Sequence, residues 1–140
     1  MRGTVTEPTG GEVAKHDGWE AAVKIDGSVT DGSVAVVETR HDPGSGASPH
    51  VHRRESETFV VLEGRFSFRL GDEQVFVEAG GVVFGPPGVV HGFEPDPNGG
   101  RLLHVFVPAG METFFTRPRD GSPESGDQLR REYGVDSVGD

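Results

Sequence analysis

The chain has 140 residues, the length of one domain, and it contains no cysteine, which excludes disulfide bridges, thiolate metal sites and cysteine nucleophiles. Thirteen basic against 23 acidic side chains give a formal charge of −10, and a surface of that sign repels phosphate backbones, so no nucleic-acid partner is expected. The sequence has neither a run of 18 apolar residues nor an apolar N-terminal stretch, so we expect a cytoplasmic protein with no membrane segment.

Short apolar runs separated by turn-forming residues extend through the chain. The 22 glycines and 10 prolines are spread along it, a pattern typical of an all-β sandwich or barrel. In chain order, the predicted strands cover residues 21–25, 33–40, 50–51, 58–62, 65–70, 74–77, 82–84, 91–93 and 102–107. Turns are predicted between them, for example at Glu63-Gly64 and at 98–100. No internal repeat is visible, so one barrel is expected and not a fused pair.

The run 65–70 shows most clearly how these strands are recognised. Phe66, Phe68 and Leu70 fall on one face of an extended chain, and Arg65 and Arg69 fall on the other. This alternation predicts a half-buried strand with its aromatic face toward the core.

Helix is scarce. The one helix that the sequence predicts covers 126–133, with Asp127 as its cap and with Leu129 and Tyr133 packed onto the barrel. The first 18 residues and the stretch 117–126 are polar and rich in glycine, proline or charge, so we expect them to be loosely ordered.

Three histidines and one glutamate are spaced so that they can meet. His50 and His52 are two residues apart on a predicted strand and therefore face the same side. The polar segment 53–56 predicts a turn, after which Glu57 begins the next strand in phase with Phe59. His91 follows a Pro-Pro-Gly turn on a later hairpin. Three imidazoles and one carboxylate suit one divalent transition-metal ion, Fe, Mn, Ni, Cu or Zn, and leave positions open for substrate.

With these residues the sequence resembles the cupin superfamily. The first cupin motif, G-x5-H-x-H-x4-E-x6-G, is met by Gly44, His50, His52, Glu57 and Gly64. The second, G-x5-P-x-G-x2-H-x3-N, is met by Gly80, Pro86, Gly88 and His91, with Pro95 in place of the final Asn. The resemblance extends over about residues 33–115.

The resemblance implies an all-β jelly-roll barrel with a short C-terminal helix. We expect an N-terminal arm over residues 1–18, the barrel over 19–116 and a tail with the helix over 117–140. It also implies a homodimer formed through edge strands, for which the N-terminal strands are the candidates. The metal would lie inside the barrel and be reached by a small-molecule substrate.

The function remains open between three classes. Residues 59–64 and 106–115 look like those of small cupins grouped with quercetin 2,3-dioxygenases, which implies a dioxygenase acting on a small aromatic or enolisable carbonyl compound. Cupin cyclases of polyketide pathways have the same size, which implies a non-oxidative cyclase or isomerase as the alternative. A cupin that binds a metal or small molecule without turnover is the third class.

Glu57 and His104 are the candidate catalytic residues. Glu57 would accept the substrate proton. His104, in phase with Leu102 and Phe106, would either line the cavity as an acid/base or a further metal ligand, or be a hydrogen-bonded core or surface residue. His41 and His16 are expected at the surface. The segment 53–55, which contains Glu55, is interpreted as a solvated turn, and six phenylalanines are assigned to the core: Phe59, Phe66, Phe68, Phe84, Phe93 and Phe106.

Overall fold

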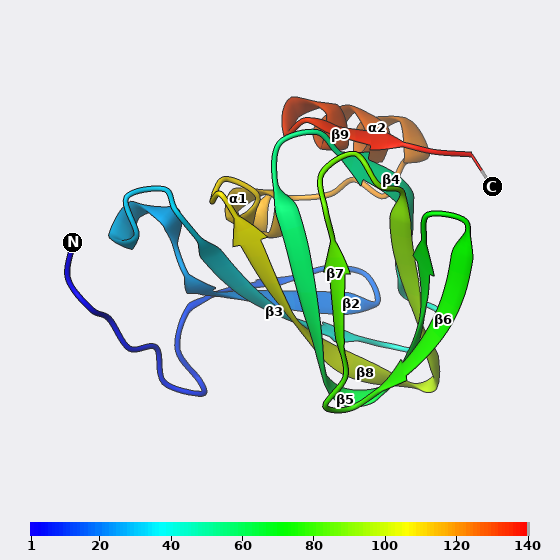
Figure 1. Ribbon diagram of the computed structural model, residues 1–140, viewed down its shortest axis with the longest axis horizontal. Helices are drawn as coiled ribbons and strands as arrows, with labels where there is room; N and C mark the ends of the chain where they lie inside the picture. Colours follow the sequence, from blue (N-terminus) through cyan, green and yellow to red (C-terminus); the bar gives the residue numbers. More distant parts are fainter. Residues whose placement is uncertain (140) are drawn as a thin grey trace.

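The computed structural model describes residues 1–139, which form an antiparallel β structure with two short helices (Figure 1). The elements are β1 (Glu12–Lys15), β2 (Trp19–Ile25), a 3-10 turn η1 (Gly27–Val29), β3 (Ala35–His41), β4 (Ala47–His52), β5 (Ser56–Leu70), β6 (Glu73–Glu78), β7 (Val82–Gly85), β8 (His91–Val107), α1 (Glu112–Thr116), α2 (Pro123–Glu132) and β9 (Val135–Ser137). In this described range no α-helix lies between residues 33 and 107, as the sequence predicts.

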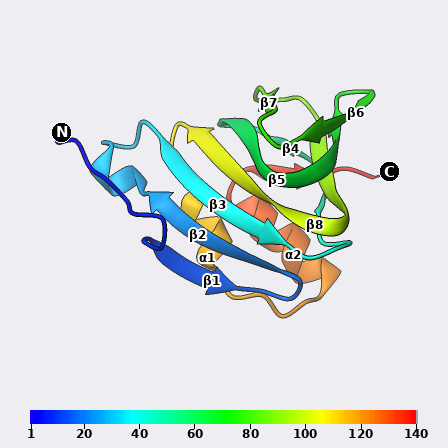
Figure 2. The ribbon, with the colours of Figure 1, turned by 90° about the horizontal axis from the view of Figure 1, so that it is seen from below.

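The strands are joined in the order β1-β2-β3-β8-β4-β9, and β5 pairs with β8, β6 and β7. The long strands β5 and β8 pair along most of their length, from Ser56↔Val107 to Leu70↔His91. One end of β8 also pairs with β3 and the other with β4. Strands β5 and β8 therefore connect the other strands into one curved sheet that forms the barrel (Figure 2).

Each of these long strands replaces two shorter ones predicted from the sequence. The turns predicted at Glu63-Gly64 and at 98–100 are instead irregularities at which the register between β5 and β8 shifts. Gly64 has φ of 84°, which a side chain rarely adopts, and a Cβ there would lie 2.5 Å from the Gly99 carbonyl oxygen. The glycines thus bend the strands as a bulge does, without ending them.

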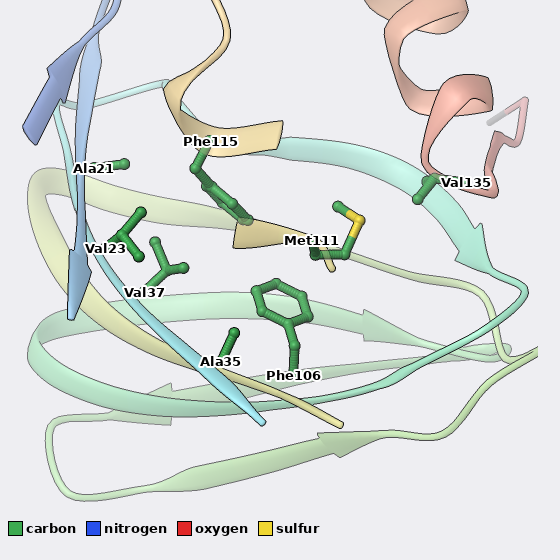
Figure 3. Close-up of a cluster of buried hydrophobic side chains, with 8 residues drawn as sticks. All are labelled: Ala21, Val23, Ala35, Val37, Phe106, Met111, Phe115 and Val135. Carbon is green, nitrogen blue, oxygen red and sulfur yellow. The ribbon is translucent and has the colours of Figure 1, made fainter. Parts of the chain in front are cut away.

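The core consists of two clusters of buried side chains. One contains Phe59, Phe66, Phe68 and Phe93, which confirms the alternation predicted for 65–70. The other lies between strands β2, β3 and β8 and the segment 111–115 (Figure 3) and contains Ala21, Val23, Ala35, Val37, Phe106, Met111, Phe115 and Val135. Phe84 was predicted to be core and is 56% exposed, because β7 pairs only with β5 and turns that residue outward.

Several elements were not predicted. Strand β1 lies within the region expected to be a loose arm, and its side chains are mostly exposed, so it shows no apolar pattern. Helix α2 begins at Pro123 and not near 126, because Ser122 caps it and proline is favoured in a first helical turn. The short helix α1 is held by Glu112, whose buried carboxylate accepts hydrogen bonds from the Gly27 and Gly110 amides.

Strand β9 and helix α2 close one end of the barrel. Strand β9 pairs with β4 through Val51↔Asp136 and its neighbours, and α2 packs against β9 (Figure 1). The C-terminal segment is thereby placed beside the histidines of β4. Neither helix within residues 1–139 has the length and apolar character needed to cross a lipid bilayer.

Candidate metal centre

Three strands bring the four predicted ligands together inside the barrel. His50 and His52 come from the same face of β4, Glu57 from the start of β5 and His91 from the start of β8, and each is at most 7% exposed. His50 is paired directly with His91 across β4 and β8. Gly85 leaves room for the His91 ring, since a Cβ there would lie 3.0 Å from its Nδ1.

The ring orientations of His50 and His52 are fixed by hydrogen bonds on the outer side of each imidazole. His50 Nδ1 donates to the Ser48 carbonyl oxygen at 2.7 Å, and His52 Nδ1 donates to Glu55 Oε1 at 2.6 Å. Because Nδ1 carries the hydrogen in both rings, Nε2 is the nitrogen left to bind an ion.

The inward-facing atoms converge on one point. His52 Nε2 and His91 Nε2 lie 3.1 and 3.0 Å from Glu57 Oε1, and the ligand atoms of these residues and His50 all lie within 4.8 Å of one another. Despite this approach to Glu57 Oε1, the buried His52 Nε2 makes no hydrogen bond of good geometry among residues 1–139. Such a nitrogen is costly to bury unless something binds it. The donor set and this atom both fit a divalent metal ion.

Electrostatics keep two of the donors in the form that binds metal. Burial lowers the pKa of His50 to about 3, so its imidazole is neutral. Burial would lower the pKa of His52 as well, but the carboxylates of Glu55 and Glu57 raise it to about 9, so a metal ion would displace the proton from Nε2 on binding. Burial alone would raise the pKa of Glu57, yet hydrogen bonds from the surrounding imidazoles, that of His104 first, hold it well below its usual range. Glu57 is therefore a carboxylate.

The second oxygen of Glu57 leads into a buried chain of polar side chains. His104 Nδ1 lies 2.7 Å from Glu57 Oε2, and His104 Nε2 lies 2.8 Å from Thr39 Oγ1. Thr39 Oγ1 is also 2.8 Å from His41 Nε2, and His41 Nδ1 is 2.8 Å from the Ser45 carbonyl oxygen. His104, Thr39 and His41 are all buried.

The donor and the acceptor of each hydrogen bond in this series can be assigned by starting from the Ser45 carbonyl oxygen. The Ser45 carbonyl can only accept, so His41 carries its hydrogen on Nδ1. Burial lowers the pKa of His41 to about 4, so the ring is neutral and its Nε2 accepts from the Thr39 hydroxyl. Thr39 Oγ1 then accepts from His104 Nε2–H. At the other end, the ionised Glu57 can only accept in its short contact with His104 Nδ1.

A cavity of about 370 Å³ opens beside the cluster. Its lining includes His50, His52, Glu57 and His104 on one side. The remaining wall combines apolar and aromatic side chains with polar ones from the C-terminal segment, among them Trp19, Phe93, Met111, Phe114, Phe115, Arg119 and Arg130. A volume of this size suits a small organic molecule.

Three residues lie elsewhere than the sequence predicted. His41 was expected at the surface and is 6% exposed, because β3 turns it inward beside His104. His16 was also expected there and is half-buried, with Nε2 at 2.7 Å from the Phe115 carbonyl oxygen and its ring stacked on Trp19. Glu55 was interpreted as part of a solvated turn and is 4% exposed, because it binds His52.

Sequence reasoning missed the cavity wall. Met111, Phe114 and Phe115 follow the last predicted strand at spacings of three and four residues, which is a helical pattern from which a short helix could have been inferred. Arg119 and Arg130 gave no such signal, because arginine in a polar stretch ordinarily faces solvent.

Comparison with known proteins agrees with this architecture. Residues 37–106 match the sequence model of the cupin domain. KdgF from Halomonas sp. is similar with a TM-score of 0.72 and 18% identity, covering 80% of this chain and 99% of that one. An RmlC-like cupin from Shewanella frigidimarina has a TM-score of 0.69 and 24% identity, and the match covers 80% of this chain and 96% of that one. An oxalate decarboxylase variant from Bacillus subtilis has a TM-score of 0.66 and 17% identity, and the match covers 99% of this chain and 44% of that one. At these identities the likeness concerns the fold. No curated protein sequence matches the chain.

Proposed function

The chain belongs to the cupin domain family, and we propose that it is a metal-dependent enzyme acting on a small aromatic or enolisable carbonyl compound, with a quercetinase-like dioxygenase as the first candidate. The observation that carries this proposal is the position of the ligand cluster. Three imidazoles and a carboxylate meet at a cavity large enough for an organic substrate. A purely structural metal site would be closed on all sides.

His50, His52, Glu57 and His91 would hold the ion through their inward-facing nitrogens and Glu57 Oε1. Such an ion, whether Fe, Mn, Ni, Cu or Zn, supplies a Lewis acid that polarises a substrate oxygen and orients it. Ser48 and Glu55 keep the two β4 rings in place for this task.

Glu57 and His104 would handle the substrate proton. Glu57 offers one oxygen to the cluster and the other to His104 Nδ1, so a proton accepted at Glu57 lies within one hydrogen bond of His104. The chain through Thr39 to His41 holds the His104 ring in a single orientation. In this proposal His104 is a partner of Glu57 and not a metal ligand.

The cavity wall supports a flat substrate. Trp19, Phe93 and Phe115 line it together with Met111, whereas no asparagine or glutamine does so among the described residues. Aromatic and thioether surfaces favour a planar ring over a sugar with many hydroxyl groups.

A non-oxidative cyclase or isomerase is the second candidate. The hydrogen-bonded chain from Glu57 to His41 favours it, because such a chain serves proton movement whether or not the substrate is oxidised. A binding protein without turnover would use the same cavity but would have no need of this hydrogen-bonded series behind Glu57.

The test begins with protein purified without chelators. Its metal content is measured by mass spectrometry, and oxygen uptake and product formation are followed with quercetin and with a panel of aromatic ketones. Near-stoichiometric metal with oxygen uptake supports the dioxygenase. Metal-dependent product without oxygen uptake replaces it by the cyclase or isomerase. Bound metal with no turnover of any compound contradicts an enzymatic role.

A further inference from the structure

Two arginines of the C-terminal segment line the cavity in which the proposed reaction takes place. Arg119 lies between α1 and α2, and Arg130 lies on α2. Both are only partly exposed, and within residues 1–139 neither forms an ion pair with a carboxylate. The charge of Asp127 acts on Arg130 and opposes the lowering of its pKa by burial, whereas no carboxylate of the described residues acts on Arg119 in this way. A partly desolvated cation without a counter-charge, such as Arg119, is costly, so its retention indicates a ligand of opposite charge.

Arg119 is held in place with much of its guanidinium free. Its charge lies over the rings of Phe114 at 4.4 Å and Trp19 at 5.5 Å. Nη1 donates to the Phe114 and Arg117 carbonyl oxygens, while Nε and Nη2 make no hydrogen bond within the described residues. Burial lowers the pKa of Arg119, as expected for a charge removed from water. The free edge has the geometry that binds a carboxylate with two bonds.

Arg130, unlike Arg119, uses both of its terminal nitrogens in hydrogen bonds within the protein. Its Nη1 donates to Ser48 Oγ and Ser137 Oγ at 3.1 and 2.9 Å, and its Nη2 donates to the Ser48 carbonyl oxygen at 3.2 Å. That carbonyl also accepts from His50 Nδ1. Arg130 thus ties α2 to β4 and adds positive charge to the cavity. Asp127, a carboxylate of α2 that also lines the cavity, accepts a hydrogen bond from Ser137 Oγ at 2.6 Å.

We propose that the substrate carries a carboxylate that Arg119 binds, so that the enzyme acts on an aromatic or enolisable acid and not on a neutral compound. This inference rests on the proposed function, since it assumes that the reacting part of the same molecule reaches the metal cluster. The formal charge of −10 makes such a local site necessary, because the molecule as a whole repels anions. The apolar side chains that line the same cavity would receive the body of the substrate.

The test compares benzoate with benzamide, two probes of the same shape that differ in charge. Trp19 is the only tryptophan in the chain and lies in the cavity wall, so its fluorescence reports binding directly. The metal-loaded protein should bind benzoate at least about tenfold more tightly than benzamide, the scale of a charge-assisted hydrogen-bond pair. Arg119→Gln should abolish this preference. Arg117→Gln is the matched control, because Arg117 is exposed and pairs with Glu132, and it should keep the preference.

A carboxylate could instead bind the metal, so each titration is repeated after chelation. A benzoate preference that survives in Arg119→Gln and disappears with the metal overturns the proposal, as does equal binding of both probes to the wild type. The benzoate titrations do not test the proposed function, which is tested separately by the measurements of metal content and turnover. A protein that binds benzoate through Arg119 but converts no substrate would contradict the enzyme and leave the anion site established.

Discussion

The hydroxyl of Thr39 should be worth several kilocalories per mole of stability, although it is a single buried oxygen. It accepts from His104 and donates to His41, both at 2.8 Å, and it is 1% exposed. Thr39→Val has nearly the same shape and suits the strand equally well, so it leaves no cavity. It leaves a buried imidazole nitrogen unpaired on each side, at about 1–3 kcal/mol apiece. We therefore expect a loss of roughly 2–6 kcal/mol.

The assay is urea unfolding of chelated protein, which separates this loss from metal binding. Thr39→Ser is the control: it keeps the hydroxyl and loses one methyl group, at about 1 kcal/mol. If Thr39→Val unfolds within about 0.5 kcal/mol of the wild type, or if both variants lose the same amount, then the hydrogen-bonded chain does not exist as described.

Four further predictions concern the site and the assembly. Replacing His52 or His91 by Ala should remove most of the bound metal, measured by mass spectrometry, while the circular dichroism of the barrel is kept; retention of stoichiometric metal would contradict the ligand set. Glu57→Gln should keep much of the metal but lower turnover by about 10²–10⁴-fold, and a wild-type rate would reduce Glu57 to a ligand only. Burial, with a smaller effect of His104, lowers the pKa of His41 from 6.5 to about 4, so on acidification the unfolded protein takes up this proton at a higher pH than the folded protein does. The free energy of unfolding should therefore fall as the pH drops from 6.5 to 4, by roughly 3 kcal/mol more in the wild type than in His41→Gln. Parallel curves of stability against pH for the two proteins would refute this prediction. Sedimentation should show a homodimer, and a monomer at micromolar concentration would refute that assembly without affecting the fold.

The barrel and the four ligands could be predicted from the sequence because their signals are local. The alternation of Phe66 and Phe68 with arginines marks a half-buried strand, and the spacing of His50 and His52 places both on one face of β4. Glu57 required one more step, the turn at 53–56, and the structure has it in phase with Phe59 as predicted. In each case neighbouring residues carry the information.

The rest depends on contacts between distant segments. Thr39 and His41 meet His104 only because β3 pairs with β8, where Val37 lies opposite His104. Strand β9 has three residues, too few for any periodicity, and its pairing with β4 joins positions more than 80 residues apart. Glu55 lies in a polar turn, where nothing local distinguishes a carboxylate that orients His52 from one that faces water. The arginines of the cavity wall were missed for the same reason.

The central claim is that this barrel holds one metal ion on His50, His52, Glu57 and His91. A crystal structure of the protein purified without chelators, with anomalous diffraction recorded at the absorption edge of the metal found by mass spectrometry, tests it most directly. The account predicts a single anomalous peak per chain, at roughly 2.0–2.3 Å from the Nε2 atoms of the three histidines and bound to Glu57. A peak elsewhere, or one with only a single histidine in its coordination shell, would contradict it.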